Sequence, residues 1–500
     1  MSFSTNQING TKYKIPEQKD DKKNIDSFLL KNKNKPVVVV QGLGFVGSVM
    51  ALVCANSKKK DYAVIGIDLP TEFSYWKIKS INEGVFPIIS SDKKIDKYYK
   101  NSIKQGNFYA SYDSYAYSKA DIIIVDINLD VFKLTSEKGD LKNFDVNLNP
   151  FKKAIQEIGS YCRDDVLIIV ETTVPPGTCN KVVYPIIKSS LEHRGLSSEK
   201  FMIGHSYERV MPGPNYIDSI ENFYRVFSGI DEKSIYATEQ FLKTIISTSK
   251  YPLTMLKNTN ATEIAKVLEN SYRAMNIAFM VEWSRFAEES GVNLYEIVDA
   301  IRMRPTHNNL MYPGIGVGGY CLTKDPLLAS WSKINLFESK ENLNQSITGV
   351  KINDKMPLYA YNVLKNQIKD AKLNVKNVLL LGVSYRSDVA DTRYTPVELF
   401  YDLLLAENLN VILHDPYVNY WEEKDIYISN NLDECFKKNI DLVVYSTSHT
   451  DYKNSNKLNK LINNRKNLFI FDTVGVLSED EIQKFKINHI VRVLGRGDIT

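Results

Sequence analysis

The chain has 500 residues, 43% of them hydrophobic and 24% charged, which is typical of a globular protein with apolar material for roughly two to four domains. Its 63 Lys and Arg residues nearly balance 59 Asp and Glu, and a net charge of +4 is too small to argue for a nucleic-acid or membrane partner. No apolar run approaches the ~18 residues of a membrane span and no secretion signal opens the chain, so we expect a cytoplasmic protein.

The chain opens with a polar segment. Residues 1–35 are rich in Lys, Asn and Asp, which leaves too little apolar surface to offset the entropy cost of ordering them. We therefore expect a mobile N-terminal extension with one helical turn near residues 25–31.

From Pro36 onward, short apolar runs alternate with polar, helix-like segments. Strands that are apolar on both faces indicate a parallel sheet covered by helices on each side. The predicted strands are Val37–Val40, Ala63–Ile67, Asp121–Val125, Val166–Val170 and Phe201–Ile203.

The alternation breaks near residue 255. Residues 258–290 contain neither Pro nor Gly, and their apolar spacing predicts one long helix or two continuous ones. Alternation resumes with predicted strands at Val378–Leu381, Val411–Leu413, Leu442–Val444 and Leu468–Phe471. The expected fold class is therefore α/β, with two Rossmann-like, doubly wound parallel-sheet domains at 36–250 and 351–500 joined by a long central helical segment at 251–350.

The first predicted strand runs into Gly42, Gly44 and Gly47, which have GxGxxG spacing and precede an apolar helix pattern. The first glycine allows a tight turn, the second lets a pyrophosphate approach the backbone, and the third lets the helix pack on the strand. Asp68 ends the second strand, where a carboxylate can bind an adenosine ribose and disfavours a 2′-phosphate. A glycine turn also occurs in unrelated α/β domains, but these features together favour NAD as the cofactor.

A second glycine-rich loop precedes Cys321, and Lys324 and Asp325 follow it. The amides of such a loop can close around a ligand, and a nearby lysine can lower the pKa of a thiol. Cys321 is therefore a candidate nucleophile. The other four cysteines are interpreted as small buried hydrophobes. Because no CxxC pair occurs, neither a disulfide framework nor a metal site is expected.

Lys266 and Asn270 are four residues apart on the predicted long helix, hence on one face of it. A lysine and an amide that point into a site could stabilise an oxyanion. A solvated helix face is the alternative interpretation of the same spacing.

Several motifs, in order, resemble the UDP-sugar 6-dehydrogenase family, which includes UDP-glucose, UDP-N-acetylglucosamine and UDP-N-acetylmannosamine dehydrogenases. The resemblance spans about residues 36–495 and rests on GLGFVG, INEGVFPI, ETTVPPGT, YERVMPG, the Lys266/Asn270 helix, GVGGYCLTKD, VSYRSDVADTR, HDPYV and FDTVGV. It implies an NAD-binding domain at 36–250, a central dimerisation and catalytic segment at 251–350, and a UDP-sugar-binding domain at 351–500. It also implies a homodimer or higher homo-oligomer, paired through the central helix.

The resemblance further implies a four-electron oxidation of a C6 alcohol by two successive NAD molecules, for surface polysaccharide biosynthesis. The intermediate aldehyde would be held by Cys321 as a thiohemiacetal and then as a thioester, which water hydrolyses to the uronate.

Site roles follow from the resemblance position by position. Lys266 and Asn270 would stabilise the oxyanion, Asp325 would assist proton transfer or orient water, Glu208 would act as an acid, base or water-positioning group, and Thr173 would hold a water. The implied cofactor contacts are Gly42, Gly44, Phe45, Val46, Gly47, Asp68, Thr172 and Arg393. The implied substrate contacts are Arg209, Arg304, Tyr312, Gly318 and Arg386, with Arg304 reaching a neighbouring subunit's substrate. For each charged residue, a surface salt bridge is the alternative.

The sequence departs from the family pattern at three places near the expected site. Residues 126–130 replace the VPTP that many relatives have after the third strand. Tyr207 replaces the usual proline before Glu208, and Tyr320 stands where N-acetylhexosamine enzymes often have histidine. These three departures fall at the expected contacts to the cofactor and the sugar.

Two features favour a UDP-N-acetylhexosamine, either UDP-GlcNAc or UDP-ManNAc, over UDP-glucose. Residues 209–213 are similar to the RVxPG of the acetylamino branch, in which Arg209 could bind the acetamido group, and Tyr385-Arg386 is similar to its Tyr-Lys pair. Two other classes stay open: a nucleotide-sugar-binding regulator without turnover, and a two-electron NAD oxidoreductase such as a hydroxyacid dehydrogenase. The first should lack Cys321, Lys266 or Asp325, and the second needs no second nucleotide domain.

Overall fold

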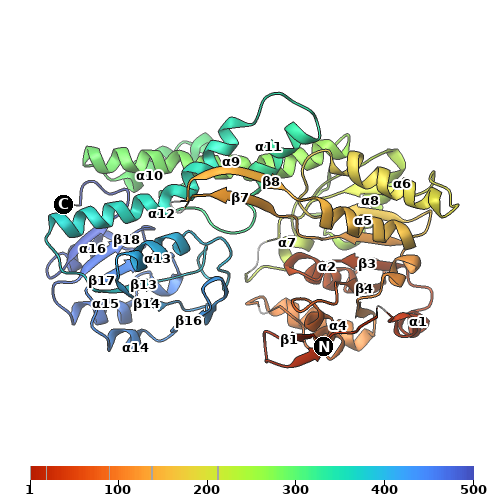
Figure 1. The fold of residues 1–500 in the computed structure, drawn as a ribbon, viewed down its shortest axis with the longest axis horizontal. Helices are drawn as coiled ribbons and strands as arrows, with labels where there is room; N and C mark the ends of the chain where they lie inside the picture. The colour runs from red at the N-terminus through yellow and green to blue at the C-terminus, as the bar shows by residue number, and fades with distance from the viewer. Residues whose placement is uncertain (1, 19, 89, 137–138, 211–212, 500) are drawn as a thin grey trace. The chain divides into compact units, whose positions relative to one another are not determined.

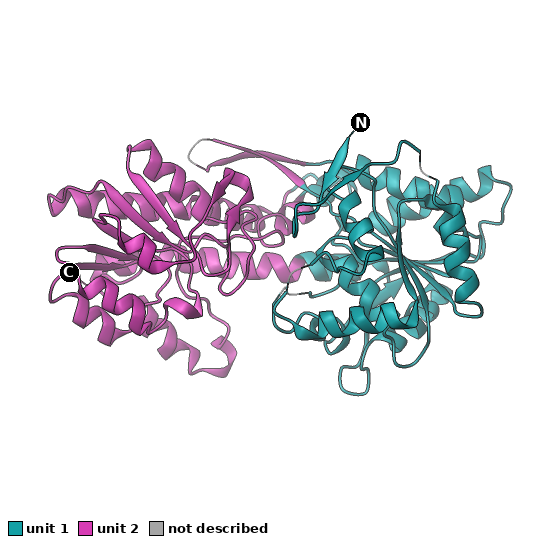
Figure 2. Ribbon diagram, turned by 90° about the horizontal axis from the view of Figure 1, so that it is seen from below, with its two compact units in different colours: residues 1–130, 146–267, 331–341 teal, residues 131–145, 268–330, 342–500 magenta. Residues whose placement is uncertain are grey.

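The computed structural model divides into two compact units, teal and magenta in Figure 2. Unit 1 comprises residues 1–130, 146–267 and 331–341, and unit 2 comprises residues 131–145, 268–330 and 342–500. The residues that the structure describes are 2–18, 20–88, 90–136, 139–210 and 213–499.

Unit 1 is built on an eight-stranded sheet (Figure 1). In spatial order its strands are β12 (Thr254–Met255), β11 (Val226–Gly229), β10 (Met202–His205), β9 (Leu167–Val170), β6 (Ile122–Val125), β3 (Val37–Gln41), β4 (Ala63–Ile67) and β5 (Phe108–Ser111). Neighbouring strands are parallel except β10 and β11. All five strands predicted in this part of the chain are confirmed. The sheet that they form confirms the predicted Rossmann-like domain.

The strands β5, β11 and β12 were not predicted, because they are short and mix apolar with polar or small residues. The helices assigned to unit 1 are α1 (Lys22–Lys31), α2 (Phe45–Ala55), α3 (Tyr75–Asn82), α4 (Lys93–Gln105), α5 (Asn149–Tyr161), α6 (Tyr184–His193), α7 (Asp218–Glu221) and α8 (Glu232–Ile245), with a 3-10 turn at Ser114–Lys119 and a π-helical turn at Cys179–Val183.

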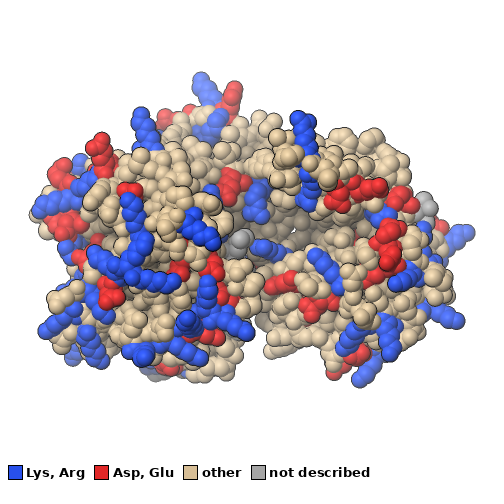
Figure 3. All heavy atoms as spheres, turned by 180° about the vertical axis from the view of Figure 1, so that it is seen from behind, with Lys and Arg blue, Asp and Glu red and all other residues tan. Residues whose placement is uncertain are grey.

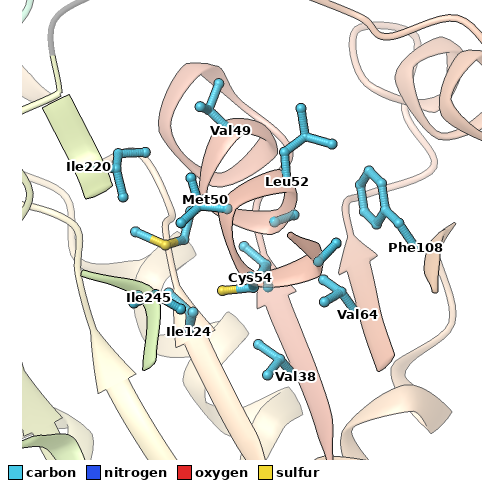
Figure 4. Packing of buried hydrophobic residues seen from close by; sticks show 14 of the residues in the cluster. Val38, Val49, Met50, Leu52, Cys54, Val64, Phe108, Ile124, Ile220 and Ile245 are labelled. Atoms are coloured by element: carbon cyan, nitrogen blue, oxygen red, sulfur yellow. The ribbon is translucent and has the colours of Figure 1, made fainter. Parts of the chain in front are cut away.

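Helix α2 packs its apolar side chains on the sheet of unit 1 (Figure 4). Met50 and Cys54 point among Val38 of β3, Ile124 of β6 and Ile245 of α8. Because β3 is fully buried as well, its carboxyl end and the start of α2 are fixed by the core, and the glycine turn between them is held on both sides.

The N-terminal extension is not the mobile segment expected from its polarity. Its described residues form β1 (Phe3–Thr5), paired with β2 (Lys12–Lys14), and the ten-residue helix α1. Ile25 is fully buried and Phe28 is 9% exposed, stacked on Tyr109 of β5 at 5.6 Å between ring centroids. The prediction was wrong because two apolar residues one helical turn apart are enough to anchor the helix on β5, the edge strand of the sheet.

Unit 2 is built on a five-stranded, fully parallel sheet. Its spatial order is β14 (Asn410–His414), β13 (Asn377–Leu381), β17 (Leu442–Tyr445), β18 (Phe469–Asp472) and β19 (Ile490–Val493). The four predicted strands are confirmed; β19 was not predicted. The helices are α10 (Leu294–Arg302), α12 (Asn344–Asp370), α13 (Val397–Ala406), α14 (Leu432–Phe436), α15 (Asn456–Asn463) and α16 (Glu479–Phe485), with 3-10 turns at Pro305–His307, Glu422–Lys424 and Thr450–Tyr452 and the strand pair β15 (Tyr420–Trp421) and β16 (Ile426–Tyr427).

Two small strands, β7 (Val131–Thr135) and β8 (Leu141–Val146), lie between two segments of unit 1 in the sequence but belong mainly to unit 2. Lys133 forms an ion pair with Asp354 of α12 at 2.9 Å, with both side chains mostly buried. Leu141 packs on Leu327 and Val350. The strand pair is therefore anchored to unit 2 by both charge and apolar contacts.

Helix α9 (Thr259–Ser290) is a single 32-residue helix, which confirms the predicted long helix. It begins in unit 1 and ends in unit 2, and α11 (Asp325–Asn335) also crosses between the units. Lysine, arginine and acidic side chains are interspersed over the face drawn in Figure 3. Among the described residues, no helix is long and apolar enough to cross a membrane.

Candidate active site

The glycine turn of unit 1 joins β3 to α2. Gly42 has φ +99°, and a Cβ there would collide with the carbonyl oxygen of Asp126; a Cβ at Gly47 would collide with the carbonyl of Gly42. A Cβ added at Gly44, by contrast, would have no atom within 4 Å, so the space over this residue is open. Gly44 is also the N-cap of α2 and offers no side-chain cap, and a helix N-terminus of this kind suits an anion.

Asp68 lies where β4 ends, beside this turn. Its Oδ2 accepts a hydrogen bond from Leu43 N at 3.0 Å and its Oδ1 accepts one from Leu69 N at 2.7 Å. Burial raises the pKa of this carboxyl, and Lys77 and the two amide bonds oppose the shift. Each oxygen keeps a further lone pair, so the open turn and the carboxylate fit the pyrophosphate and ribose of a dinucleotide. Phe45 and Val46 follow Gly44 at the start of α2 and are partly or largely exposed.

The ends of β6 and β9 continue the same edge of the sheet. Thr172 donates its hydroxyl to the carbonyl of Ile127 at 2.8 Å, and Thr173 next to it is 9% exposed. Asp126, the first residue of the departure from VPTP, is buried, and burial and then Glu208 raise its pKa well above the usual value, while Arg225 opposes them. Position 126 therefore places a buried carboxyl group beside the glycine turn.

Lys266 and Glu208 lie together in unit 1. The Lys266 Nζ donates to the carbonyl oxygen of Glu208 at 2.9 Å and lies 5.5 Å from the centre of the Tyr207 ring. The Glu208 carboxylate accepts the N–H of Val210. At 7% exposure Lys266 is not on a solvated helix face, so the alternative interpretation fails for it.

Arg209 is oriented by its aromatic neighbours. Its guanidinium donates to the carbonyl of Tyr224 at 3.1 Å and lies over the rings of Tyr207 and Phe223. The guanidinium also donates to the Tyr207 hydroxyl at 3.3 Å, so the stack and these bonds fix the orientation of the arginine. Met211 and Pro212 of the RVxPG-like motif lie outside the described residues.

Two buried groups that support this half of the site were not found from the sequence. Glu171 and Arg225 form an ion pair in which both side chains are at most 4% exposed. Behind Lys266, the fully buried His205 bonds Thr262, which also bonds Ser228, each at 2.7 Å. The only signals in the sequence are the motifs ETT, which contains Glu171, and GHSYER, which contains His205. The residues that these two side chains bind are distant along the chain.

Unit 2 carries the cysteine loop. Gly319 has φ +80°, and a Cβ at Gly318 or Gly319 would collide with Tyr385. Cys321 is exposed and, among the described residues, the five cysteines form no disulfide; the other four are buried, as predicted. The carbonyl of Cys321 accepts the N–H of Asp325 at 2.9 Å, so the thiol lies one turn before α11.

Asn270 and Asp325 meet in the interior of unit 2. The Asn270 Nδ2 donates to Asp325 Oδ2 at 2.6 Å, and the two side chains are 5% and 0% exposed. The Lys324 Nζ lies 3.6 Å from Asp325 Oδ1 and 4.2 Å from the centre of the Tyr320 ring. The sequence-predicted residues Asn270, Cys321 and Asp325 therefore share one unit, and Lys324 is an additional charged group beside them.

The predicted arginines differ in their surroundings. Arg393 makes two bonds to Asp391, at 2.9 and 2.6 Å, and lies 5.9 Å from the Tyr320 ring. Arg386 and Arg304 are exposed. Tyr312 donates to Asp299 and has the Arg302 guanidinium 4.0 Å from its ring centre, so it is fixed on the side of α10.

Cofactor and metal chemistry can be judged from these donors. Among the described residues, no three or more His, Cys, Asp or Glu side chains gather as metal ligands would. A thiol, a buried amine and a dinucleotide-like turn are groups that suit an oxidation with covalent capture.

The chain matches three domains of one family: the NAD binding domain over residues 36–246, the central domain over 260–348 and the UDP binding domain over 379–479. The chain belongs to the UDP-glucose/GDP-mannose dehydrogenase family. As a member it is an oxidoreductase that uses NAD, and the resemblance, fold class and cofactor inferred from the sequence are confirmed.

Several relatives of this family are similar along most of the chain. A UDP-N-acetyl-D-mannosamine dehydrogenase of Methanocaldococcus jannaschii is 31% identical, over 92% of this chain and 96% of its own. The structure of the UDP-D-ManNAc dehydrogenase of Pyrococcus horikoshii has TM-score 0.76 and 27% identity, covering 93% of this chain and 100% of that one. An NDP-N-acetyl-D-galactosaminuronic acid dehydrogenase of Methanosarcina mazei Go1 has TM-score 0.75 and 25% identity, over 95% and 98%.

Proposed function

We propose that this protein oxidises the C6 alcohol of a UDP-N-acetylhexosamine to the uronic acid, with UDP-N-acetylmannosamine as the leading substrate, for surface polysaccharide biosynthesis. The relatives named above act on acetylamino sugars, which also favours the acetylamino interpretation of Arg209 over UDP-glucose. The Arg209 guanidinium lies over the Tyr207 ring, and a guanidinium can donate to an acetamido oxygen.

One observation carries the proposal: two buried polar side chains, each held in place, lie one turn apart on α9. Lys266 is bonded to Glu208 and Asn270 to Asp325. On one helix this spacing leaves roughly 6 Å between the Cβ atoms. A buried amine and amide on one helix face suit the stabilisation of an alkoxide or oxyanion at C6.

Cys321 supplies the covalent step in this proposal. Once the alcohol has become an aldehyde, the thiolate adds to the carbonyl carbon, and the oxygen takes a proton to give a thiohemiacetal. The second oxidation gives a thioester, and water cleaves its C–S bond to release carboxylate and thiol. The overall balance is one alcohol, two NAD⁺ and one water to one carboxylate, two NADH and three protons.

Residues of unit 1 hold the dinucleotide in this proposal. The turn at Gly42, Gly44 and Gly47 receives the pyrophosphate and Asp68 the ribose, with Thr172 further along the same edge. When bound, NAD accepts two electrons in each oxidation. Thr173 and Glu208 position the hydrolytic water, and Asp325, held by Asn270, takes or returns its proton.

Further contacts and partners stay predictions. We assign the UDP part to Arg386, Gly318 and Tyr312, with Arg393 near the cofactor and Arg304 reaching a second subunit. A cytoplasmic location without nucleic-acid or membrane partners fits a UDP-sugar and NAD as cosubstrates. We also propose the domain boundaries predicted from the sequence, at 36–250, 251–350 and 351–500.

The proposed homodimer is supported by the exposed side chains of α9. Apolar residues recur at helical spacing along it and are exposed in the described chain: Ile264 47%, Leu268 62%, Tyr272 53%, Phe279 52%, Trp283 46% and Phe286 59%. A stripe of this kind marks an interaction surface rather than a solvated face.

A substrate panel tests the proposal. Purified protein is incubated with NAD and, separately, with UDP-ManNAc, UDP-GlcNAc, UDP-GalNAc and UDP-glucose, and NADH absorbance is read against sugar consumed. We expect two NADH per uronate formed and the highest kcat/KM with UDP-ManNAc. One NADH per sugar would contradict double oxidation, and no NADH with any sugar would favour the non-catalytic regulator.

A further inference from the structure

The described part of the N-terminal extension lies outside the residues that the family domains match, which begin at residue 36. We refer to its β1, β2 and α1, with Asp21 as the N-cap of α1, as the N-terminal brace. The buried polar contacts of Ser4 and Asp21 lead toward one place, the segment between β4 and α3 that starts with Asp68.

The first contact caps a helix from outside. Ser4 in β1 is fully buried; its hydroxyl donates to the carbonyl of Glu72 at 2.7 Å and accepts the N–H of Trp76 at 3.0 Å. Trp76 is the second residue of α3, and the residue that should cap this helix, Ser74, instead donates to the carbonyl of Leu69. The brace therefore supplies a bond that α3 does not make for itself.

The second contact lies at the other end of the segment. Asp21 is 6% exposed and accepts hydrogen bonds from the Ser111 hydroxyl at 2.6 Å and from Tyr109 at 2.8 Å. The carbonyl of Ser111 in turn accepts the N–H of Asp68 at 3.2 Å. Asp21 thus holds the residue whose backbone fixes Asp68.

The remainder of the brace packs along the same elements. Tyr13 donates to Glu83, the residue after α3, at 2.7 Å, and Phe28 stacks on Tyr109. Ser4 and Tyr13 therefore engage opposite ends of α3, and α1 covers the edge strand β5. Asp68 and the helix after it are restrained from both sides by residues 4–28.

We propose that the N-terminal brace holds the Asp68 segment in its NAD-binding conformation, so that Ser4 and Asp21 are positioning residues for the adenosine half of the cofactor. This inference rests on the proposed contact of Asp68 with the ribose. A segment that is ordered before binding loses less conformational entropy when the ligand arrives, which appears as tighter binding. Loss of the brace should therefore weaken NAD binding without changing the chemistry at Cys321.

The test measures the Kd of NAD by isothermal titration calorimetry on the full chain carrying Ser4→Ala, Asp21→Ala or both. Each lost hydrogen bond is worth roughly a two- to tenfold rise in Kd. Thr5→Ala and Lys23→Ala are the matched controls, because both side chains are exposed on the same elements; they should bind NAD as the wild type does. In steady state, KM for NAD should rise while kcat and KM for the UDP-sugar stay unchanged, a split that partial unfolding would not produce.

Asp68→Ala distinguishes failure of the proposed ribose contact from failure of the proposed role of the brace. If it leaves the Kd of NAD unchanged, the proposed ribose contact is wrong. If it weakens binding while Ser4→Ala, Asp21→Ala and the double variant all bind NAD as tightly as the wild type, the brace has no role in the cofactor site and the inference is overturned. Asp21→Asn in the full chain decides the matter where an alanine variant does not fold by circular dichroism.

Discussion

Cys321 is the residue on which the proposed chemistry depends. It is the exposed thiol of a glycine loop, whereas Cys435 in the same unit is buried. We expect Cys321→Ser to abolish steady uronate formation and to leave the Kd of NAD unchanged, because a hydroxyl is a much poorer nucleophile toward the aldehyde. NADH absorbance and calorimetry measure the two quantities.

Cys435→Ser is the matched control for loss of a thiol and should retain turnover. Normal turnover by Cys321→Ser would exclude covalent capture at this position. A burst of NADH without steady formation would instead show that the first oxidation proceeds alone.

His205 gives a pH dependence of stability. Burial and then the charge of Lys266 lower its pKa to about 3. The unfolded chain titrates this group near pH 6.5, so below that pH the unfolded state binds more protons and the folded state loses stability, at up to ~1.4 kcal/mol per pH unit. We therefore expect wild type to lose this contribution as the pH falls from about 6.5 toward about 3.

His205→Gln removes the titration and keeps a partner for Thr262. Urea unfolding of both proteins should show the stability advantage of the wild type shrinking by ~2 kcal/mol between about pH 7 and about pH 5. A difference in unfolding free energy that stays constant with pH would show that His205 is not a neutral, buried imidazole in the folded protein.

At the residue scale the sequence predicted those side chains that lie in short, dense motifs. The loop around Cys321 and the pair Lys266 and Asn270 could be found because glycine spacing and helical spacing are local properties. The bond between His205 and Thr262 could not, since 57 residues separate them and only the tertiary fold brings them together.

At the scale of elements, the buried pair of Glu171 and Arg225 joins the end of β9 to the residue before β11. Removing one partner leaves an uncompensated charge in the interior. We expect Arg225→Leu to lower the free energy of unfolding by ~3–5 kcal/mol and Arg225→Leu with Glu171→Gln to recover part of that loss.

Lys94→Ala is the control, because the pair of Lys94 with Asp218 is 46% and 30% exposed and should contribute less than ~1 kcal/mol. Both measurements use urea unfolding at one pH. Equal losses of unfolding free energy in Arg225→Leu and Lys94→Ala would contradict the expectation that the buried ion pair contributes more than the exposed one.

The sequence identified elements where the pattern is strong, as in α9 and in β3, whose first four residues are valines. It missed β11, whose Val-Phe-Ser-Gly mixes residue types, and the pair β7 and β8, whose alternation is polar and short. The extension was misjudged for a related reason: average polarity hides the few apolar and hydroxyl contacts, at Ile25 and Ser4, that order it.

At the scale of the whole molecule, the apolar stripe of α9 predicts self-association. Trp283 is 46% exposed and packs between Phe279 and Phe286. A glutamate there would place a charge in the interface, so Trp283→Glu should shift the protein to a smaller species in sedimentation velocity.

Tyr427→Glu is the control for a charge on an exposed aromatic position, since Tyr427 is 87% exposed and lies far along the chain in β16. It should sediment as the wild type does. A wild type that sediments as an active monomer would contradict the proposed dimer.

The chain passes between the two units at five points, after residues 130, 145, 267, 330 and 341. No single cut in the polypeptide can therefore release either unit: a protease that nicks one connection leaves four others covalently joined. A gene divided at any one position would likewise encode two fragments, at least one of which lacks part of a unit. The two large sheets themselves lie in separate stretches of the chain, at 37–255 and 377–493, so the segments that cross between the units, rather than the sheets, tie the two units together in the sequence.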